Sequence, residues 1–174
     1  NAVVIGSETM SRVLDWQDRS TCVLFGDGAG AVVLKGSSVP GGVMATTLRS
    51  DGSGADLLSL PALYHNPVPI SGAEYSTNGH HKNIVEMDGR QVYRFATNVI
   101  ASSIQDVLKQ AELTIDDIAL IIPHQANTRI IETAAKKLKL PMEKFFLNVE
   151  HNGNTSAASI PLALCDAVRD GRLK

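Results

Sequence analysis

Two apolar runs separated by an amphipathic segment constrain the fold of this chain most strongly. The run 118–122 is almost continuously apolar, which is typical of a strand covered on both faces of a sheet. Residues 128–138 repeat apolar side chains at helical spacing and carry lysines toward their end, and 145–149 is apolar again. This strand, helix, strand order predicts an α/β fold whose sheet lies between helices.

The rest of the chain continues this alternation. Strands are expected over 3–5, 21–25, 29–34 and 43–48, with Gly26-Asp27-Gly28 as a tight turn between two of them. Helices are expected over 92–113 and 157–168, with Pro161 in the first turn of the second helix. Residues 49–81 are rich in Gly, Ser, Pro, Asn and His, which predicts a long surface loop.

Composition is that of an ordinary globular protein. Hydrophobic residues make up 44% of the 174 residues and charged residues 20%, and the formal net charge is -2, so no nucleic-acid or membrane surface is expected. Cys22 and Cys165 lie far apart in apolar contexts, which favours a reduced, cytoplasmic protein with both thiols buried. The chain starts inside an apolar run and stops just after a helix, so we expect a piece of a longer protein.

His124 and Asn154 stand beyond the C-terminal ends of two expected strands, the edge at which open α/β sheets bind ligands. Histidine is a tunable donor near neutral pH, and asparagine presents an N–H dipole that cannot ionise. Two such donors aimed at one oxygen stabilise an enolate or an oxyanion, and each is worth about 3 to 4 kcal/mol of barrier. Spacing alone leaves open that His124 caps a helix and Asn154 stabilises a turn.

Three other patterns are weaker. The glycines of 26–30 precede a strand-like run, so no helix N-terminus is expected there to hold a nucleotide phosphate. His65, His80 and His81 have no carboxylate or cysteine at ligand spacing, and we predict no metal site. Neither cysteine has the setting of a nucleophile.

Four segments, taken in order, resemble one family. They are 25–34 (FGDGAGAVVL), 87–93 (MDGRQVY), 123–129 (PHQANTR) and 153–159 (GNTSAAS), and they closely resemble 3-oxoacyl-[acyl-carrier-protein] synthase III of the thiolase superfamily. The resemblance implies a thiolase-like layered α/β/α/β/α fold that is incomplete in this chain. Residues 1–36 would end its N-terminal half, and 37–174 would form most of its C-terminal half, truncated before the last strands. The nucleophilic cysteine of the family would lie upstream.

The resemblance also implies a function. The family starts type II fatty acid synthesis by decarboxylative Claisen condensation of an acyl-CoA primer, such as acetyl-CoA, with the malonyl thioester of acyl carrier protein. It implies a cytoplasmic homodimer that uses these thioesters as substrates and needs no cofactor. The fragment alone is expected to be inactive. The alternative is a non-catalytic or polyketide-type thiolase-like subunit that pairs with an active partner.

Site residues carry over by position in the matching segments. His124 and Asn154 match the His and Asn of the Cys-His-Asn triad. The carrier-protein segment corresponds to Gln125, Ala126, Asn127, Thr128 and Arg129, and the positions near coenzyme A and pantetheine correspond to Arg19, Met87, Tyr93 and Asn127. Tyr93 is often Phe in relatives and Arg90 a smaller polar residue, so the tunnel here departs from the usual pattern.

Overall fold

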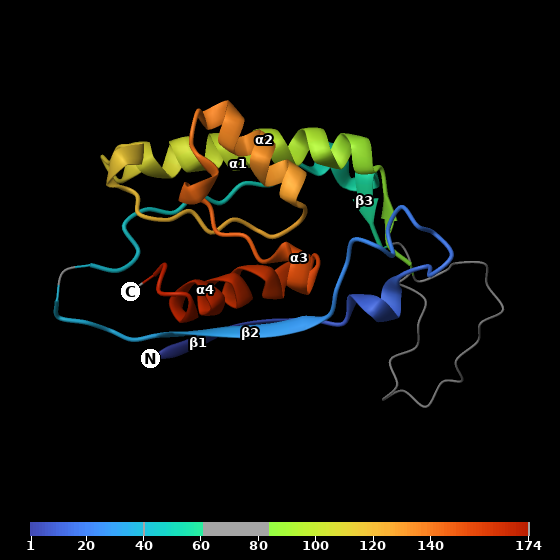
Figure 1. Ribbon diagram of the computed structural model, residues 1–174, viewed down its shortest axis with the longest axis horizontal. Helices are drawn as coiled ribbons and strands as arrows, with labels where there is room; N and C mark the ends of the chain where they lie inside the picture. Colours follow the sequence, from blue (N-terminus) through green and yellow to red (C-terminus); the bar gives the residue numbers. More distant parts are fainter. Residues whose placement is uncertain (40, 61–83, 174) are drawn as a thin grey trace.

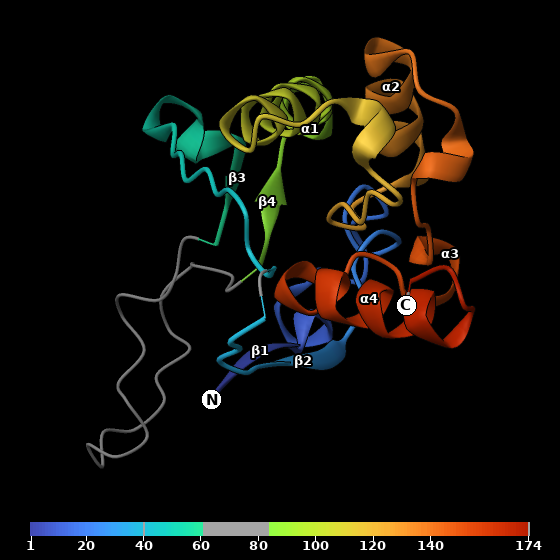
Figure 2. The same ribbon diagram turned by 90° about the vertical axis from the view of Figure 1, so that its left-hand side faces the viewer.

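A computed structural model describes residues 1–39, 41–60 and 84–173 (Figure 1). Helices α1 (Gly89–Gln110) and α2 (Thr128–Leu138) lie together on one side. Helix α4 (Ser159–Arg169) lies between them and the antiparallel pair β1 (Ala2–Glu8) and β2 (Gly28–Leu34), as both Figure 1 and Figure 2 show. The shorter elements are η1 (Met10–Val13), η2 (Gly52–Leu57), β3 (Leu58–Ser59), β4 (Glu86–Met87), η4 (Ile115–Asp117), η5 (Met142–Lys144), α3 (Val149–Asn152) and η6 (Ser156–Ala158). None of the described helices is long and apolar enough to cross a membrane.

The apolar runs 118–122 and 145–149 lie side by side in the middle of these layers. Ile121 and Phe145 form a parallel bridge, in which the Ile121 N–H donates to the Lys144 carbonyl at 2.7 Å and the Phe146 N–H donates to the Ile121 carbonyl at 2.9 Å. Alternate side chains enter two separate cores. The core against α2 contains Ile121, Phe145, Ile131 and Ala135, and the core against α4 contains Ile122, Phe146, Ala163 and Ala167. The predicted covering on both faces is confirmed, but regular pairing stops at one bridge because Pro123 has no N–H to donate to the Phe146 carbonyl, which accepts the Gln125 side chain instead.

The helices follow their sequence signals. Helix α2 has the predicted bounds because the Asn127 side chain accepts the Arg129 N–H at its start and Lys139 takes a left-handed conformation at its end. Helix α1 begins three residues earlier than predicted, since Asp88 caps it by accepting two backbone N–H groups. Pro161 is the third residue of α4, where its missing N–H has no intrahelical partner to lose. Its predicted place in the first turn is confirmed.

Glycines let the β1–β2 pair approach η6 and α4 closely. The register runs from Ala2 opposite Leu34 to Glu8 opposite Gly28. A Cβ on Gly6 would lie 2.2 Å from the carbonyl oxygen of Ala157, and a Cβ on Gly30 would lie 2.9 Å from Pro161 Cβ. The backbone of β1 therefore rests directly against the turn that precedes α4.

The predicted strands 118–122 and 145–149 form a single bridge in place of regular strands, and two other predicted strands are also wrong. Residues 21–25 form turns, because the Asp18 side chain accepts hydrogen bonds from Ser20 and Thr21, and only Phe25 makes a bridge. Gly26-Asp27-Gly28 does not connect paired strands, since β2 pairs with β1 and Asp27 accepts from Ser11 across the intervening segment. Residues 43–48 form no strand.

The predicted long loop contains structure at its start. Helix η2 occupies 52–57, and β3 then pairs with β4 through Leu58 opposite Met87, so two short regular elements stand at the surface where only a loop was expected. The candidate metal ligands His65, His80 and His81 lie outside the described residues. The expectation of two buried thiols is also wrong, since Cys165 is exposed on α4 and Cys22 is half-buried in a turn.

A hydroxyl joins α1 to α2 and gives a stability test. Tyr93 Oη lies 2.6 Å from Thr133 Oγ1 and donates to the Arg129 carbonyl at 3.3 Å. We expect Tyr93→Phe to lower the free energy of unfolding of the full-length protein by about 0.5 to 1.5 kcal/mol, measured by urea denaturation. Thr133→Val removes the same hydroxyl pair, so the double variant should lose less than the two single losses combined. If the losses of unfolding free energy in the two single variants add up to the loss in the double variant, Tyr93 and Thr133 do not share a hydrogen bond.

Candidate active site

His124 lies in the loop between the bridge at Ile121 and the start of α2. Its Nδ1 is 2.5 Å from the Oγ of Ser159, the first residue of α4. The backbone N–H of Gln125 also points at this oxygen and donates to it at 3.3 Å. The other ring nitrogen, Nε2, has no hydrogen-bond partner among the described residues. The imidazole is thus held on one side and open on the other.

Burial sets the charge of this imidazole. The His124 residue keeps an exposed edge, but the surrounding protein removes enough water to lower its pKa below the ordinary value of 6.5. Desolvation is the cause of this shift. His124 is therefore neutral at pH 7, the form in which one ring nitrogen donates and the other accepts.

Asn154 is fixed through both its backbone and its side chain. It pairs in parallel with Phe25: the Asn154 N–H donates to the Leu24 carbonyl and the Gly26 N–H donates to the Asn154 carbonyl, both at 2.9 Å. Its Oδ1 accepts the backbone N–H of Ser156 at 3.0 Å. Because a backbone nitrogen can only donate, the carboxamide oxygen must face Ser156. The Nδ2 group then faces away, with no partner in the described part of the chain.

The structure attaches both predicted residues to one short segment, 154–159. Asn154 begins this segment and binds Ser156, and His124 binds Ser159 at its end. His124 is anchored through Nδ1 and Asn154 through Oδ1, and each side chain presents another atom, a nitrogen, that is unpaired within the described residues. This arrangement suits donation to a ligand oxygen, the chemistry of an oxyanion site.

Gln125 does not fit its predicted role at a carrier-protein surface. Its side chain is 0% exposed, its Nε2 donates to the carbonyls of Pro123 and Phe146 at 2.9 and 3.1 Å, and its Oε1 accepts the Asn148 N–H at 3.0 Å. The buried amide ties the His124 loop to the segment that follows Phe145. Gln125 is therefore a positioning residue here, and a partner protein cannot reach its side chain in this structure.

The remaining predicted site residues fall in two places. Arg129 is exposed in the first turn of α2, with Asn127 as its cap and Ala126 and Thr128 half-buried beside it. The Tyr93 hydroxyl reaches this same turn from α1, because it binds the Arg129 carbonyl. Met87 is half-buried in β4, and Arg19 is exposed in the turns after η1. The contacts of the structure thus link Tyr93 to the Asn127–Arg129 turn and do not link Arg19 or Met87 to it.

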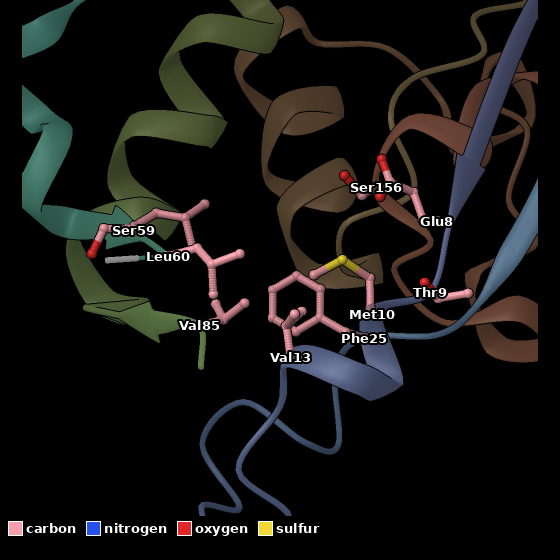
Figure 3. Close-up of a pocket in the computed structure, with 10 residues that line it drawn as sticks. Glu8, Thr9, Met10, Val13, Phe25, Ser59, Leu60, Val85 and Ser156 are labelled. Atoms are coloured by element: carbon pink, nitrogen blue, oxygen red, sulfur yellow. The ribbon is translucent and has the colours of Figure 1, made fainter. Parts of the chain in front are cut away.

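A pocket that the sequence did not predict adjoins Asn154. It encloses about 420 Å³, and Figure 3 shows Met10, Val13 and Phe25 facing Leu60 and Val85 across it. The other lining residues are Glu8, Thr9, Leu58, Ser59 and Ser156. Phe25 and Ser156 connect the pocket to Asn154, one through the backbone bridge and the other through the carboxamide. The sequence signal that could have indicated the pocket was Phe25, the aromatic residue that opens the segment 25–34. We assigned Phe25 to the expected strand 21–25.

No metal centre accompanies these groups in the described part of the chain. Within residues 1–39, 41–60 and 84–173, His, Cys, Asp and Glu side chains do not gather in threes that could hold an ion. Cys22 lies 3.9 Å from the Trp16 carbonyl, and Cys165 is exposed on α4. Neither contacts His124 or Asn154.

The layered arrangement places the chain in the class of thiolase-like α/β proteins. A family model described as 3-oxoacyl-[acyl-carrier-protein] synthase III matches residues 1–52, and the model of the C-terminal part of the same enzyme matches residues 108–174. The chain belongs to the 3-oxoacyl-[acyl-carrier-protein] synthase III family.

Individual relatives agree with this assignment. The chain is 47% identical over 174 residues to a β-ketoacyl-[acyl-carrier-protein] synthase III of Clostridium perfringens and covers 52% of that protein. The crystal structure of the Thermus thermophilus enzyme matches 99% of this chain over 51% of its own, with 41% identity and a TM-score of 0.86. A priming β-ketosynthase of the R1128 polyketide pathway matches 98% of this chain over 49% of its own, with 36% identity and a TM-score of 0.79. The chain spans about half the length of these relatives.

Proposed function

We propose that the full-length protein joins an acyl primer to a malonyl thioester by decarboxylative Claisen condensation. Its substrates would be acyl-CoA and malonyl-[acyl-carrier-protein], and the active protein would be a homodimer. One observation carries the proposal: His124 and Asn154, anchored on the segment 154–159, each keep a nitrogen that is unpaired among the described residues. Two donors on one thioester oxygen are what an enolate intermediate requires.

The chemistry follows from these two donors. Cleavage of the bond between the malonyl carboxylate and its α-carbon releases CO₂, and the electron pair moves into the thioester to form an enolate. His124 Nε2 and Asn154 Nδ2 stabilise the enolate oxygen, and neither side chain needs a net charge to do so. The enolate carbon then attacks the primer carbonyl, a carbon–carbon bond forms and the thiolate that held the primer leaves. The family resemblance supplies that thiolate as a cysteine upstream of this chain.

The pocket beside Asn154 suits the primer. Its lining is mainly apolar, and Glu8 and Ser156 lie near each other on one side of it, with Ser59 on the opposite side (Figure 3). An acyl chain seated against Phe25 and Met10 would keep its carbonyl close to the segment 154–159. This placement supports a short aliphatic acyl group as the substrate class.

The proposal has a direct test. The full-length protein is incubated with acetyl-CoA and malonyl-[acyl-carrier-protein], and the carrier protein is analysed by mass spectrometry. A 3-oxoacyl group on the carrier is the expected product. A carrier protein that stays malonylated would contradict the proposal.

Arg129 gives a test of carrier docking. Its side chain is exposed at the start of α2, close to the anchored His124 loop, where its positive charge suits a carrier protein with an acidic surface. We expect Arg129→Glu to lower kcat/KM for malonyl-[acyl-carrier-protein] about tenfold or more, because an attraction becomes a repulsion. Arg169→Glu, an equal charge change in the last turn of α4, is the matched control. Equal effects of the two changes would contradict docking at α2.

The similarity to a polyketide priming ketosynthase favours one alternative. The same donors would then elongate a primer on a carrier protein of polyketide synthesis. Parallel assays with carrier proteins of both kinds separate the two functions. A non-catalytic partner subunit is less well supported, because such a subunit has no use for both His124 and Asn154.

A further inference from the structure

We propose that Ser159 is a positioning residue that fixes the ring proton of His124 on Nε2, so that this nitrogen donates to the substrate oxygen. The inference rests on the proposed function, because it specifies how one of the two donors is prepared. It assigns Ser159 a role that acts through His124.

The direction of the hydrogen bonds carries the argument. The Gln125 N–H is an obligate donor, and it points at Ser159 Oγ at 3.3 Å. That oxygen accepts from Gln125, and within the described residues the one acceptor within reach of its own hydrogen is His124 Nδ1, 2.5 Å away. If Nδ1 accepts, the single ring proton of a neutral imidazole must lie on Nε2.

Burial keeps the hydrogen bonds from Gln125 to Ser159 and from Ser159 to His124 in place. Ser159 is only 2% exposed, and its backbone N–H donates to the Ser156 carbonyl. Gln125, at the other end, is 0% exposed and held by three hydrogen bonds of its own side chain. Water cannot readily replace the serine hydroxyl, and the hydroxyl cannot turn away without leaving polar groups unpaired.

The charged groups nearby do not provide another explanation. Glu8 of β1 reaches the same segment, since its carboxylate accepts the Ala157 N–H at 3.4 Å. Desolvation, and none of these charges, lowers the pKa of His124. The titratable and charged residues of β1, α2, α3 and α4 are Glu8, Arg129, Glu132, Lys136, Lys137, Glu150, His151, Cys165, Asp166 and Arg169.

The first readout locates the proton without any assay of activity. Histidine-selective ¹⁵N NMR of the full-length protein, with the His124 signals identified by their loss in His124→Ala, distinguishes a protonated ring nitrogen from an unprotonated one. At about pH 8, above the ordinary histidine pKa of about 6.5, we expect a protonated Nε2 in the wild type and a mixture of tautomers in Ser159→Ala. A protonated Nδ1 in the wild type would overturn the proposal.

The second readout separates positioning from a general structural role. At about pH 8 we expect Ser159→Ala to decarboxylate malonyl-[acyl-carrier-protein] about tenfold more slowly than the wild type. The difference in decarboxylation rate between the wild type and Ser159→Ala should become smaller as the pH falls below the pKa of His124. An imidazolium carries hydrogen on both nitrogens whatever its neighbour. Ser159→Thr keeps the hydroxyl and should retain most of the rate. A deficit that is the same at every pH, or equal in both variants, would overturn the proposal.

Folding and the proposed function are checked separately. Thermal melting and acylation of the protein by acyl-CoA, followed by intact mass, show whether a variant is folded. A wild type that does not decarboxylate malonyl thioesters would refute the proposed function, and the NMR result alone would then support or overturn the proton assignment.

Discussion

His124→Ala in the full-length enzyme is expected to slow malonyl decarboxylation at least about a hundredfold and to leave acylation by acyl-CoA largely intact. Loss of one donor to a developing oxyanion typically costs a factor of about 10² to 10³. Asn154→Ala should have an effect of the same order, because its Nδ2 is the second donor. Release of CO₂ from malonyl-[acyl-carrier-protein] measures the first step, and intact mass measures acylation.

His151→Ala is the matched control. This histidine is exposed on α3, where its Nε2 lies 3.4 Å from Glu150 Oε1, so its removal should leave both steps unchanged. Decarboxylation that survives both His124→Ala and Asn154→Ala would refute the assigned roles. If a variant loses acylation as well as decarboxylation, its site has lost its structure as a whole, and the result does not report on a single donor.

Gly6→Ala is expected to destabilise the protein by about 1 to 3 kcal/mol or more and to impair the site as well. The new methyl group would meet the Ala157 carbonyl oxygen at 2.2 Å, and a backbone oxygen cannot swing aside as a flexible side chain can. Relief requires β1 or η6 to move, and η6 carries the turn between Asn154 and Ser159. Urea denaturation gives the stability change, and CO₂ release shows the effect on the site.

Gly36→Ala is the control for this change. Nothing lies within 4 Å of the Cβ that it would add, so its effect on stability should stay within about 0.5 kcal/mol. If the two glycine variants were equally stable, the close approach of β1 to η6 would not exist in the protein.

Local patterns predicted the helices well. Helix α2 has its predicted bounds because its cap, apolar stripe and C-terminal lysines all agree. The strands at 21–25 and 43–48 were wrong because short apolar runs do not show what they pair with. At 21–25, side-chain hydrogen bonds from Ser20 and Thr21 to Asp18 form turns instead, which is a competing use of the same residues.

The candidate residues of the site come from the sequence, and the connections between them come from the structure. His124 and Asn154 follow from their positions beyond strand ends and from the family motifs. Ser159 lies 35 positions from His124 in the sequence, and its hydroxyl matters only because α4 brings it to the ring. The pocket was missed for a similar reason, since its lining comes from elements that are far apart along the chain.

The burial of Gln125 separates two features that lie next to each other in the sequence, the anchoring of His124 and the exposed face of α2. His124 is held by two connections. Gln125 ties its loop to the segment after Phe145, and Ser159 ties its ring to α4. Helix α2 begins only four residues later, yet its exposed face contributes nothing to these bonds. Surface charges on α2 can therefore change without moving the His124 imidazole, and under the proposed function this would let relatives suit different carrier proteins.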